Sequence, residues 1–222
     1  MAVLSPACVE KPPATSKPER PCPAFSFLDW SGASMSFSGL DVGAVKPGHT
    51  VLAQGKCVHY LRAHTSNLVA HKRGLVLLFH GSKADMTAFE HVVAPLVNAG
   101  YDVLLPELAC DGSARAEAAQ VLRHAQGHGL GLPCDHPADG CRAYYAIWAL
   151  DDAAEFAQQF LRDVHGWDAV DLLIADDEAE QRRADDPRVL AMASDRDAGR
   201  ITPSAAQWEI ILTGLRQSNA SE

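Results

Sequence analysis

The sequence predicts an α/β fold, a mainly parallel sheet in a three-layer arrangement, and one segment, Gly74–Leu108, carries the main observations. Leu75–Phe79 and Tyr101–Leu105 are short, continuously apolar runs, the pattern of strands buried on both faces. Between them, Met86–Ala99 places its apolar residues on one stripe at helical spacing. Because two buried strands joined by a crossover helix form a βαβ unit, we expect parallel strands with helices on the faces of the sheet.

The helix of this unit has recognisable ends. Asp85 is suited to cap its first turn, and Gly100 is suited to stop it. Pro95 lies inside the helix and removes a backbone donor there, so we expect a bend at this residue.

The same patterns predict the remaining elements. Two short extended segments separated by Gly55-Lys56 indicate a hairpin at the sheet edge. Two more apolar runs indicate strands, and three segments have a helical pattern or composition. In chain order these elements are the extended segments Thr50–Gln54 and Cys57–Thr65, a short helix at Ala114–His124, a helix at Tyr144–Val164, strands at Ala169–Ile174 and Val189–Ala193, and a last helix at Ser204–Gln217.

The organisation along the chain indicates one domain. Residues 1–24 are rich in proline without hydrophobic periodicity, which predicts a disordered tail. Residues 25–217 are expected to form a single α/β domain, and residues 218–222 a frayed end.

Composition excludes several classes of partner. The net charge is −9 and no run of Lys and Arg exceeds two, which argues against nucleic acid and anionic membranes as partners. No apolar stretch approaches the roughly 20 residues of a membrane helix. The six cysteines form no framework, so we interpret them as thiols in a reducing compartment and expect a cytoplasmic protein.

Five motifs follow one another along the chain. They are LLFHG at 77–81, GYDVLLPEL at 100–108, QGHGLG at 126–131, the segment ALDDAAEFAQQFLRDVHGWDAVDLLI at 149–174, and VLAMASDRDAGRITP at 189–203. Their order and spacing resemble the α/β-hydrolase family. The resemblance covers about Val51–Leu215 and implies a hydrolase fold that is incomplete on its C-terminal side.

The resemblance also implies a reaction, acyl transfer to water. The family places a nucleophile on a tight strand-to-helix turn between small residues, with a His as base and an acid to orient it. After the strand at 169–174 the nucleophile position falls on Asp177, with Ala175 and Ala179 at the small positions. Dehalogenases and epoxide hydrolases of the family use an Asp nucleophile. The alternative is a solvated charged loop at 176–186, because Asp176, Asp177 and Glu178 would repel one another in a buried turn.

Other family positions are partly matched. Asp197 occupies the position of the acid, with Asp195 as a possible substitute, although either can be an ordinary turn carboxylate. His80, Gly81 and Ser82 occupy the oxyanion loop, where the Ser82 backbone N–H would bind the oxyanion and His80 would organise the loop.

The base of the triad has no match. The family's histidine follows the acid, whereas the last histidine here is His165. Cys134, His136 and Cys141 form a single cluster, too few for a structural zinc site, so we expect no metal and no cofactor.

Two functions follow. The resemblance implies a hydrolase of small ester-like substrates whose triad is incomplete in this chain. The alternative is a non-catalytic relative, a pseudoenzyme that at most binds a ligand or a partner. An uncovered sheet edge would allow self-association.

Overall fold

The computed structural model describes residues 45–52, 56–64, 72–81, 84, 86–109, 113–128, 130, 143–163, 170–176, 188–197 and 199–220. Asp85, the proposed helix cap, and the tail at 1–24 lie outside these residues.

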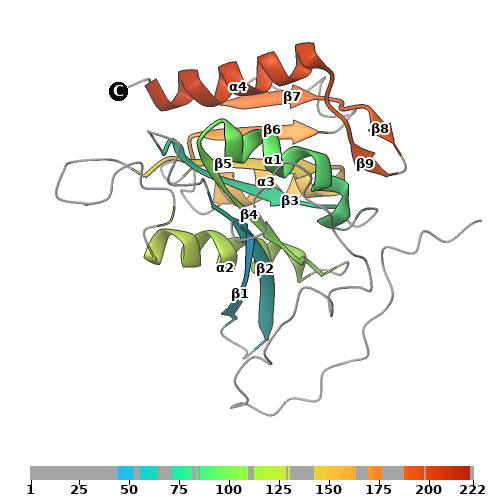
Figure 1. Ribbon diagram of the computed structural model, residues 1–222. Helices are drawn as coiled ribbons and strands as arrows, with labels where there is room; N and C mark the ends of the chain where they lie inside the picture. Colours follow the sequence, from blue (N-terminus) through green and yellow to red (C-terminus); the bar gives the residue numbers. More distant parts are fainter. Residues whose placement is uncertain are drawn as a thin grey trace, which may run out of the picture.

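A seven-stranded mixed sheet forms the centre of the molecule, in the order β1-β2-β4-β3-β5-β6-β7 (Figure 1). β2 runs antiparallel to both β1 and β4, and all other neighbours pair in parallel. The predicted α/β class with a mainly parallel sheet is therefore confirmed. The strands are β1 Val45–Val51, β2 Cys57–Ala63, β3 Gly74–Phe79, β4 Tyr101–Pro106, β5 Tyr145–Leu150, β6 Leu172–Asp176 and β7 Val189–Met192.

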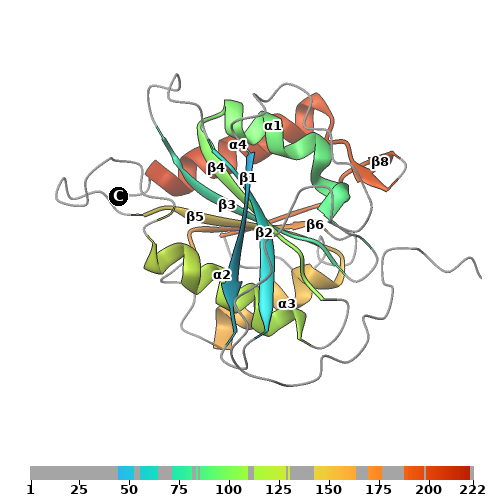
Figure 2. The ribbon, with the colours of Figure 1, turned by 60° about the horizontal axis from the view of Figure 1, so that its bottom comes forward.

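Helices cover both faces of this sheet, which gives the three layers (Figure 2). On one face, α1 (Glu90–Asn98) and α4 (Ala205–Ala220) share a hydrophobic cluster with the strands. On the other face, α2 (Ala114–Gly127) and α3 (Asp152–Asp163) contribute to a second cluster. Two separate cores follow from strands whose side chains alternate between the two faces.

The βαβ unit is formed as predicted. β3 and β4 are parallel and fully buried, and a 3-10 turn at Met86–Phe89 leads into α1 between them. Pro95 lies within α1, and Gly100 follows the helix with a φ of 97°, a conformation that glycine adopts without steric cost.

One predicted element is wrong in part. The helix expected over Tyr144–Val164 is instead the strand β5, a single turn residue Asp151, and the helix α3. All six residues of β5 are buried, because the strand lies between β3 and β6 with a helical layer on either side. A short apolar run of this kind fits a strand and a buried helix equally well from the sequence alone.

The periphery completes the architecture. The expected edge hairpin is β1–β2, and a two-stranded sheet of β8 (Arg196–Asp197) and β9 (Arg200–Ile201) follows β7. Cys57 is disulfide-bonded, so the interpretation of all six cysteines as thiols is wrong for this residue. No helix in the described part of the chain has the length and apolar character needed to cross a membrane.

Candidate functional site

The carboxyl ends of five parallel strands meet at one end of the sheet. β4, β3, β5, β6 and β7 all end there, with Phe79 paired to Ala149, Leu150 to Asp176, and Asp176 to Met192. The small β8–β9 sheet lies beside this end, at the right of Figure 1. Side chains that follow these strands are brought together here, the usual location of sites in open α/β sheets.

The turn between β5 and α3 is a sharp strand-to-helix turn made by one residue. Asp151 has a φ of 49° and is the single non-glycine residue with positive φ in the described part of the chain. Its backbone N–H donates to the Asp176 carbonyl at 3.1 Å, and its carbonyl accepts from the Ala154 N–H at 2.9 Å. Ala149 and Ala153 flank the turn and are fully buried. Small residues thus stand two positions before and two positions after Asp151, the spacing of a tight strand-to-helix nucleophile turn.

Gly81 packs directly against this turn. A Cβ atom on Gly81 would lie 2.8 Å from the Leu150 carbonyl oxygen and 3.1 Å from the Asp151 Cβ, and would collide with the Asp152 carboxylate. Only glycine therefore allows the loop after β3 to approach the turn after β5 so closely.

Both oxygens of the Asp151 carboxylate accept hydrogen bonds from an arginine. Arg196 on β8 donates from Nη2 to Oδ1 at 2.6 Å and from Nη1 to Oδ2 at 3.1 Å. The Asp151 side chain is 19% exposed and the Arg196 side chain 37% exposed, so the pair lies at the surface of the site. A bidentate pair of this kind uses both carboxylate oxygens and fixes the orientation of both groups.

A second carboxyl group lies buried behind the turn. Asp176, at the end of β6, accepts hydrogen bonds from the Ser194 N–H at 2.8 Å, the Ser194 hydroxyl at 2.6 Å and the Trp148 indole N–H at 3.1 Å. Burial raises the pKa of Asp176 above its ordinary value, although the bonds from Ser194 and Trp148 and the charge of Arg196 oppose that rise.

The imidazole of His80 is held by backbone groups. Its Nε2 accepts from the Leu108 N–H at 3.0 Å, which leaves the proton on Nδ1, and Nδ1 donates to the Gly81 carbonyl at 3.2 Å. Because an N–H can only donate, this pattern defines a neutral ring whose two nitrogens are both engaged. The geometry agrees with a role for His80 in organising the loop beside Gly81.

The other predicted residues are placed less centrally. Asp197 is exposed on β8, adjacent to Arg196, and Asp177 and Ser82 lie outside the described residues and remain predictions. Sequence reasoning missed Asp151 because the preceding strand was assigned to a helix. The signal that could have found it is the pair of alanines two residues before and after Asp151.

The arrangement supplies a carboxylate on a strained turn, and both oxygens of that carboxylate are bonded to Arg196. The side chain of Asp151 makes its bonds to Arg196, and no imidazole of a described residue is within hydrogen-bond distance of it. Hydrolysis at this turn would need a general base other than a histidine of the described residues.

Comparison with known proteins gives similarity of structure only. No family model matches the sequence, and no curated protein sequence matches it significantly. Solved structures that align with the chain include the esterase Pf2001 of Pyrococcus furiosus, at 14% identity and a TM-score of 0.47 over 72% of this chain and 54% of that one. An epoxide hydrolase of Vigna radiata aligns at 13% identity and a TM-score of 0.44 over 61% of this chain and 39% of that one.

An α/β-hydrolase from the metagenome of Lake Arreo in Spain aligns at 12% identity and a TM-score of 0.47, over 62% of this chain and 44% of that one. The chain thus spans about half the length of such proteins or less. The three aligned proteins are described as an esterase, an epoxide hydrolase and an α/β-hydrolase.

Proposed function

We propose that this protein uses a hydrolase-type scaffold to bind small ester-like ligands at the Asp151 turn without hydrolysing them. The observation that carries this proposal is the bidentate Asp151–Arg196 pair, which occupies the group that would have to act as nucleophile. The commitment of both His80 nitrogens to backbone groups supports it, because that ring has no lone pair left to accept a proton.

The binding part is tested with 4-phenylbutan-2-one, a ketone isostere of benzyl acetate that cannot be hydrolysed. Titration into the ¹⁵N-labelled protein is expected to shift the amide resonances of Gly81, Asp151 and Asp152 in a saturable way. The amide of Gly127, at the far end of α2, serves as the internal control. A titration that leaves the three turn amides unmoved contradicts the proposal.

A second candidate is a carboxylate nucleophile at Asp151. The positive φ of Asp151 and the close approach of Gly81 favour it, because backbone strain of this kind is retained where function requires it. A carboxylate oxygen would attack an sp³ carbon of an epoxide, forming a C–O bond while the ring C–O bond breaks and its oxygen takes a proton from water. Without a base, the resulting ester would persist on Asp151.

Peptide mapping by mass spectrometry after incubation with styrene oxide separates the two candidates. The second candidate requires an adduct on Asp151 that is missing in Asp151→Asn and more abundant in Arg196→Ala, in which the carboxylate is unpaired. The absence of an adduct in both wild type and Arg196→Ala eliminates it.

We also propose self-association as the form of partner binding. β7 is the edge strand on the C-terminal side of the sheet, and a second copy is expected to pair along it. The proposed cytoplasmic location conflicts with the disulfide at Cys57, since disulfides persist mainly in oxidising compartments. Peptide maps of reduced and non-reduced digests would show whether Cys57 is disulfide-bonded in the purified protein.

A further inference from the structure

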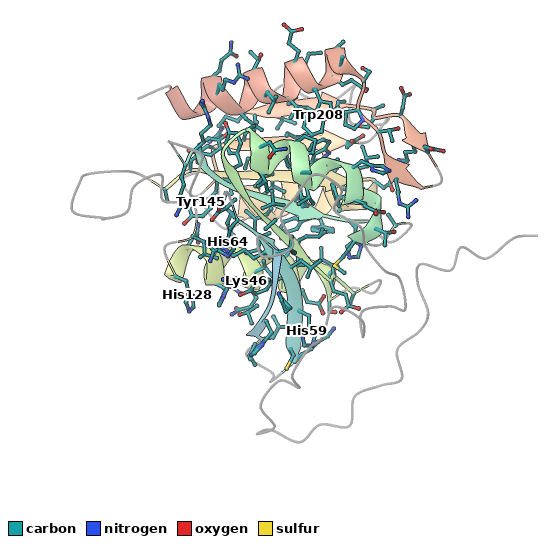
Figure 3. All side chains as sticks on the ribbon, in the orientation of Figure 1. Lys46, His59, His64, His128, Tyr145 and Trp208 are labelled. Atoms are coloured by element: carbon teal, nitrogen blue, oxygen red, sulfur yellow. The ribbon has the colours of Figure 1, made fainter. Side chains whose placement is uncertain are left out.

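The amino end of the sheet, where the parallel strands begin, carries a second cluster of charged side chains. Lys46 on β1 lies directly across from Arg62 on β2 in the antiparallel register. Arg62 donates from Nη2 to the Asp102 Oδ2 at 2.9 Å, and the Nδ1 of His64 lies 3.8 Å from the same oxygen. Lys72 lies at this end too, two residues before β3. Figure 3 labels Lys46 and His64 in this region.

Sheet geometry places these groups on one face. Arg62 pairs with Leu104 on β4, and Asp102 lies two residues before Leu104, so both side chains lie on the face of the sheet that α2 covers. On the same face, the Tyr60 hydroxyl and the Nε2 of His124 on α2 are 2.9 Å apart. The cluster is therefore built from three strands and bordered by a helix.

The cluster holds more positive charge than its carboxylate balances. Lys46 and Arg62 are like charges placed directly opposite each other on neighbouring strands, an arrangement that destabilises a sheet. Neither Lys46 nor Lys72 forms an ion pair with a described residue. Arg62 makes a single side-chain hydrogen bond within the described chain, and its Nε–H is buried without a partner there. Guanidinium donors and positive charge are thus left unused.

The pKa of His64 reflects the same excess of positive charge. This pKa is lowered first by burial and then by the charges of Arg62, Lys46 and Lys72, while Asp102 alone raises it. Three cations and one carboxylate therefore face this ring, and the potential around it is positive.

We propose that Lys46, Arg62, His64 and Lys72 form a binding site for a small phosphate-bearing anion. A phosphate carries up to two negative charges on oxygens that point in several directions, which suits cations arriving from two strands and the start of a third. Bound phosphate would offset the repulsion between Lys46 and Arg62 and would favour the protonated, donating form of His64. The net charge of −9 repels large polyanions and anionic membrane surfaces, so a small soluble ligand fits best.

The first test measures thermal unfolding in potassium phosphate against potassium chloride at equal ionic strength. Phosphate is expected to raise Tm in a saturable way. Lys46→Ala is expected to unfold at the same Tm as wild type or a higher one without phosphate, since the like-charge repulsion is gone. Its affinity for phosphate is expected to fall by about tenfold, the usual loss for one charge-assisted hydrogen bond.

Arg216→Ala is the matched control, because Arg216 is an exposed cation on α4, on the other face of the sheet. This variant is expected to bind phosphate like wild type. The proposal is overturned if phosphate and chloride give the same Tm, if Lys46→Ala keeps full affinity, or if Arg216→Ala loses as much as Lys46→Ala.

An NMR titration of the His64 ring gives an independent readout. The pKa of His64 is expected to rise when phosphate replaces chloride in wild type, and to show no such rise in the Lys46→Ala/Lys72→Ala double variant. Both lysines are exposed, so these changes leave the core intact. An equal response of His64 in the two proteins contradicts the site.

Discussion

The two ends of the sheet each carry an Asp–Arg pair, and the two pairs are built differently. At the amino end, Asp102 is 7% exposed and lies in a regular strand, so strand register alone brings it to Arg62. At the carboxyl end, Asp151 is 19% exposed and lies on a turn with a φ of 49°. The first pair is held by ordinary sheet geometry, whereas the second rests on strained backbone. The difference indicates that the amino-end pair contributes more to stability and the carboxyl-end pair more to the shape of a site.

The largest loss of stability is expected at Gly81, where the carboxyl end of the sheet is most tightly packed. Gly81→Ala should lower the free energy of unfolding by about 2 to 3 kcal/mol, because the added methyl group meets the Leu150 carbonyl and the Asp152 carboxylate. Urea denaturation measures the loss. Gly127→Ala is the matched control, since nothing lies within 4 Å of a Cβ at that position. If the two variants are equally stable, the close approach of Gly81 to the turn is not a real constraint.

The next prediction compares the stability that each of the two Asp–Arg pairs contributes. Asp102→Asn should cost about 2 kcal/mol, because it leaves the partly buried guanidinium of Arg62 without its carboxylate. Asp151→Asn should cost under about 1 kcal/mol, because exposed ion pairs contribute little. Denaturant unfolding of both variants at neutral pH gives the comparison. Equal losses would remove the distinction between the two ends.

The strain at the turn is isolated by two variants that lose the same ion pair. Asp151→Gly should be more stable than Asp151→Ala by about 1 kcal/mol, since glycine accepts a positive φ and alanine does not. The relevant measurement is the difference in Tm between these two proteins. A more stable alanine variant would show that the turn has an ordinary backbone conformation in solution.

The smallest effect is a pH dependence at the carboxyl end. Because burial raises the pKa of Asp176, the stability contributed by its protonated form is present below its ordinary pKa and is lost as the pH rises through the raised value. The stability of wild type relative to Asp176→Asn should therefore fall over that interval. Unfolding free energies measured across acidic pH test this, with the Trp148 indole N–H resonance as a local reporter. A constant difference between the two proteins would contradict it.

The sequence was informative where hydrophobic pattern and fold agree. The buried runs of β3 and β4 and the stripe of α1 defined the βαβ unit correctly, because α1 is long enough to show the helical period and Gly100 separates it from the run of β4. The segment at Tyr145–Leu150 was ambiguous, because a strand buried on both faces shows neither period. Because this strand was assigned to a helix, the turn at Asp151 after β5 was not considered as a nucleophile position, and the prediction of Asp177 after β6 stays untested.

The contacts of the site were beyond sequence reasoning for a different reason. The pairing of Asp151 with Arg196 joins residues 45 positions apart. The burial of Asp176 against Trp148 depends on the register of β5 and β6. Such long-range pairings arise from sheet order, which no local pattern encodes.

The most direct test of the account is the initial rate of benzyl acetate hydrolysis by wild type and by Asp151→Asn, measured against buffer. We predict that both proteins leave the buffer rate unchanged, because the carboxylate at the turn is paired with Arg196 and no imidazole of a described residue lies beside it. A wild-type rate above buffer that disappears in Asp151→Asn would contradict it.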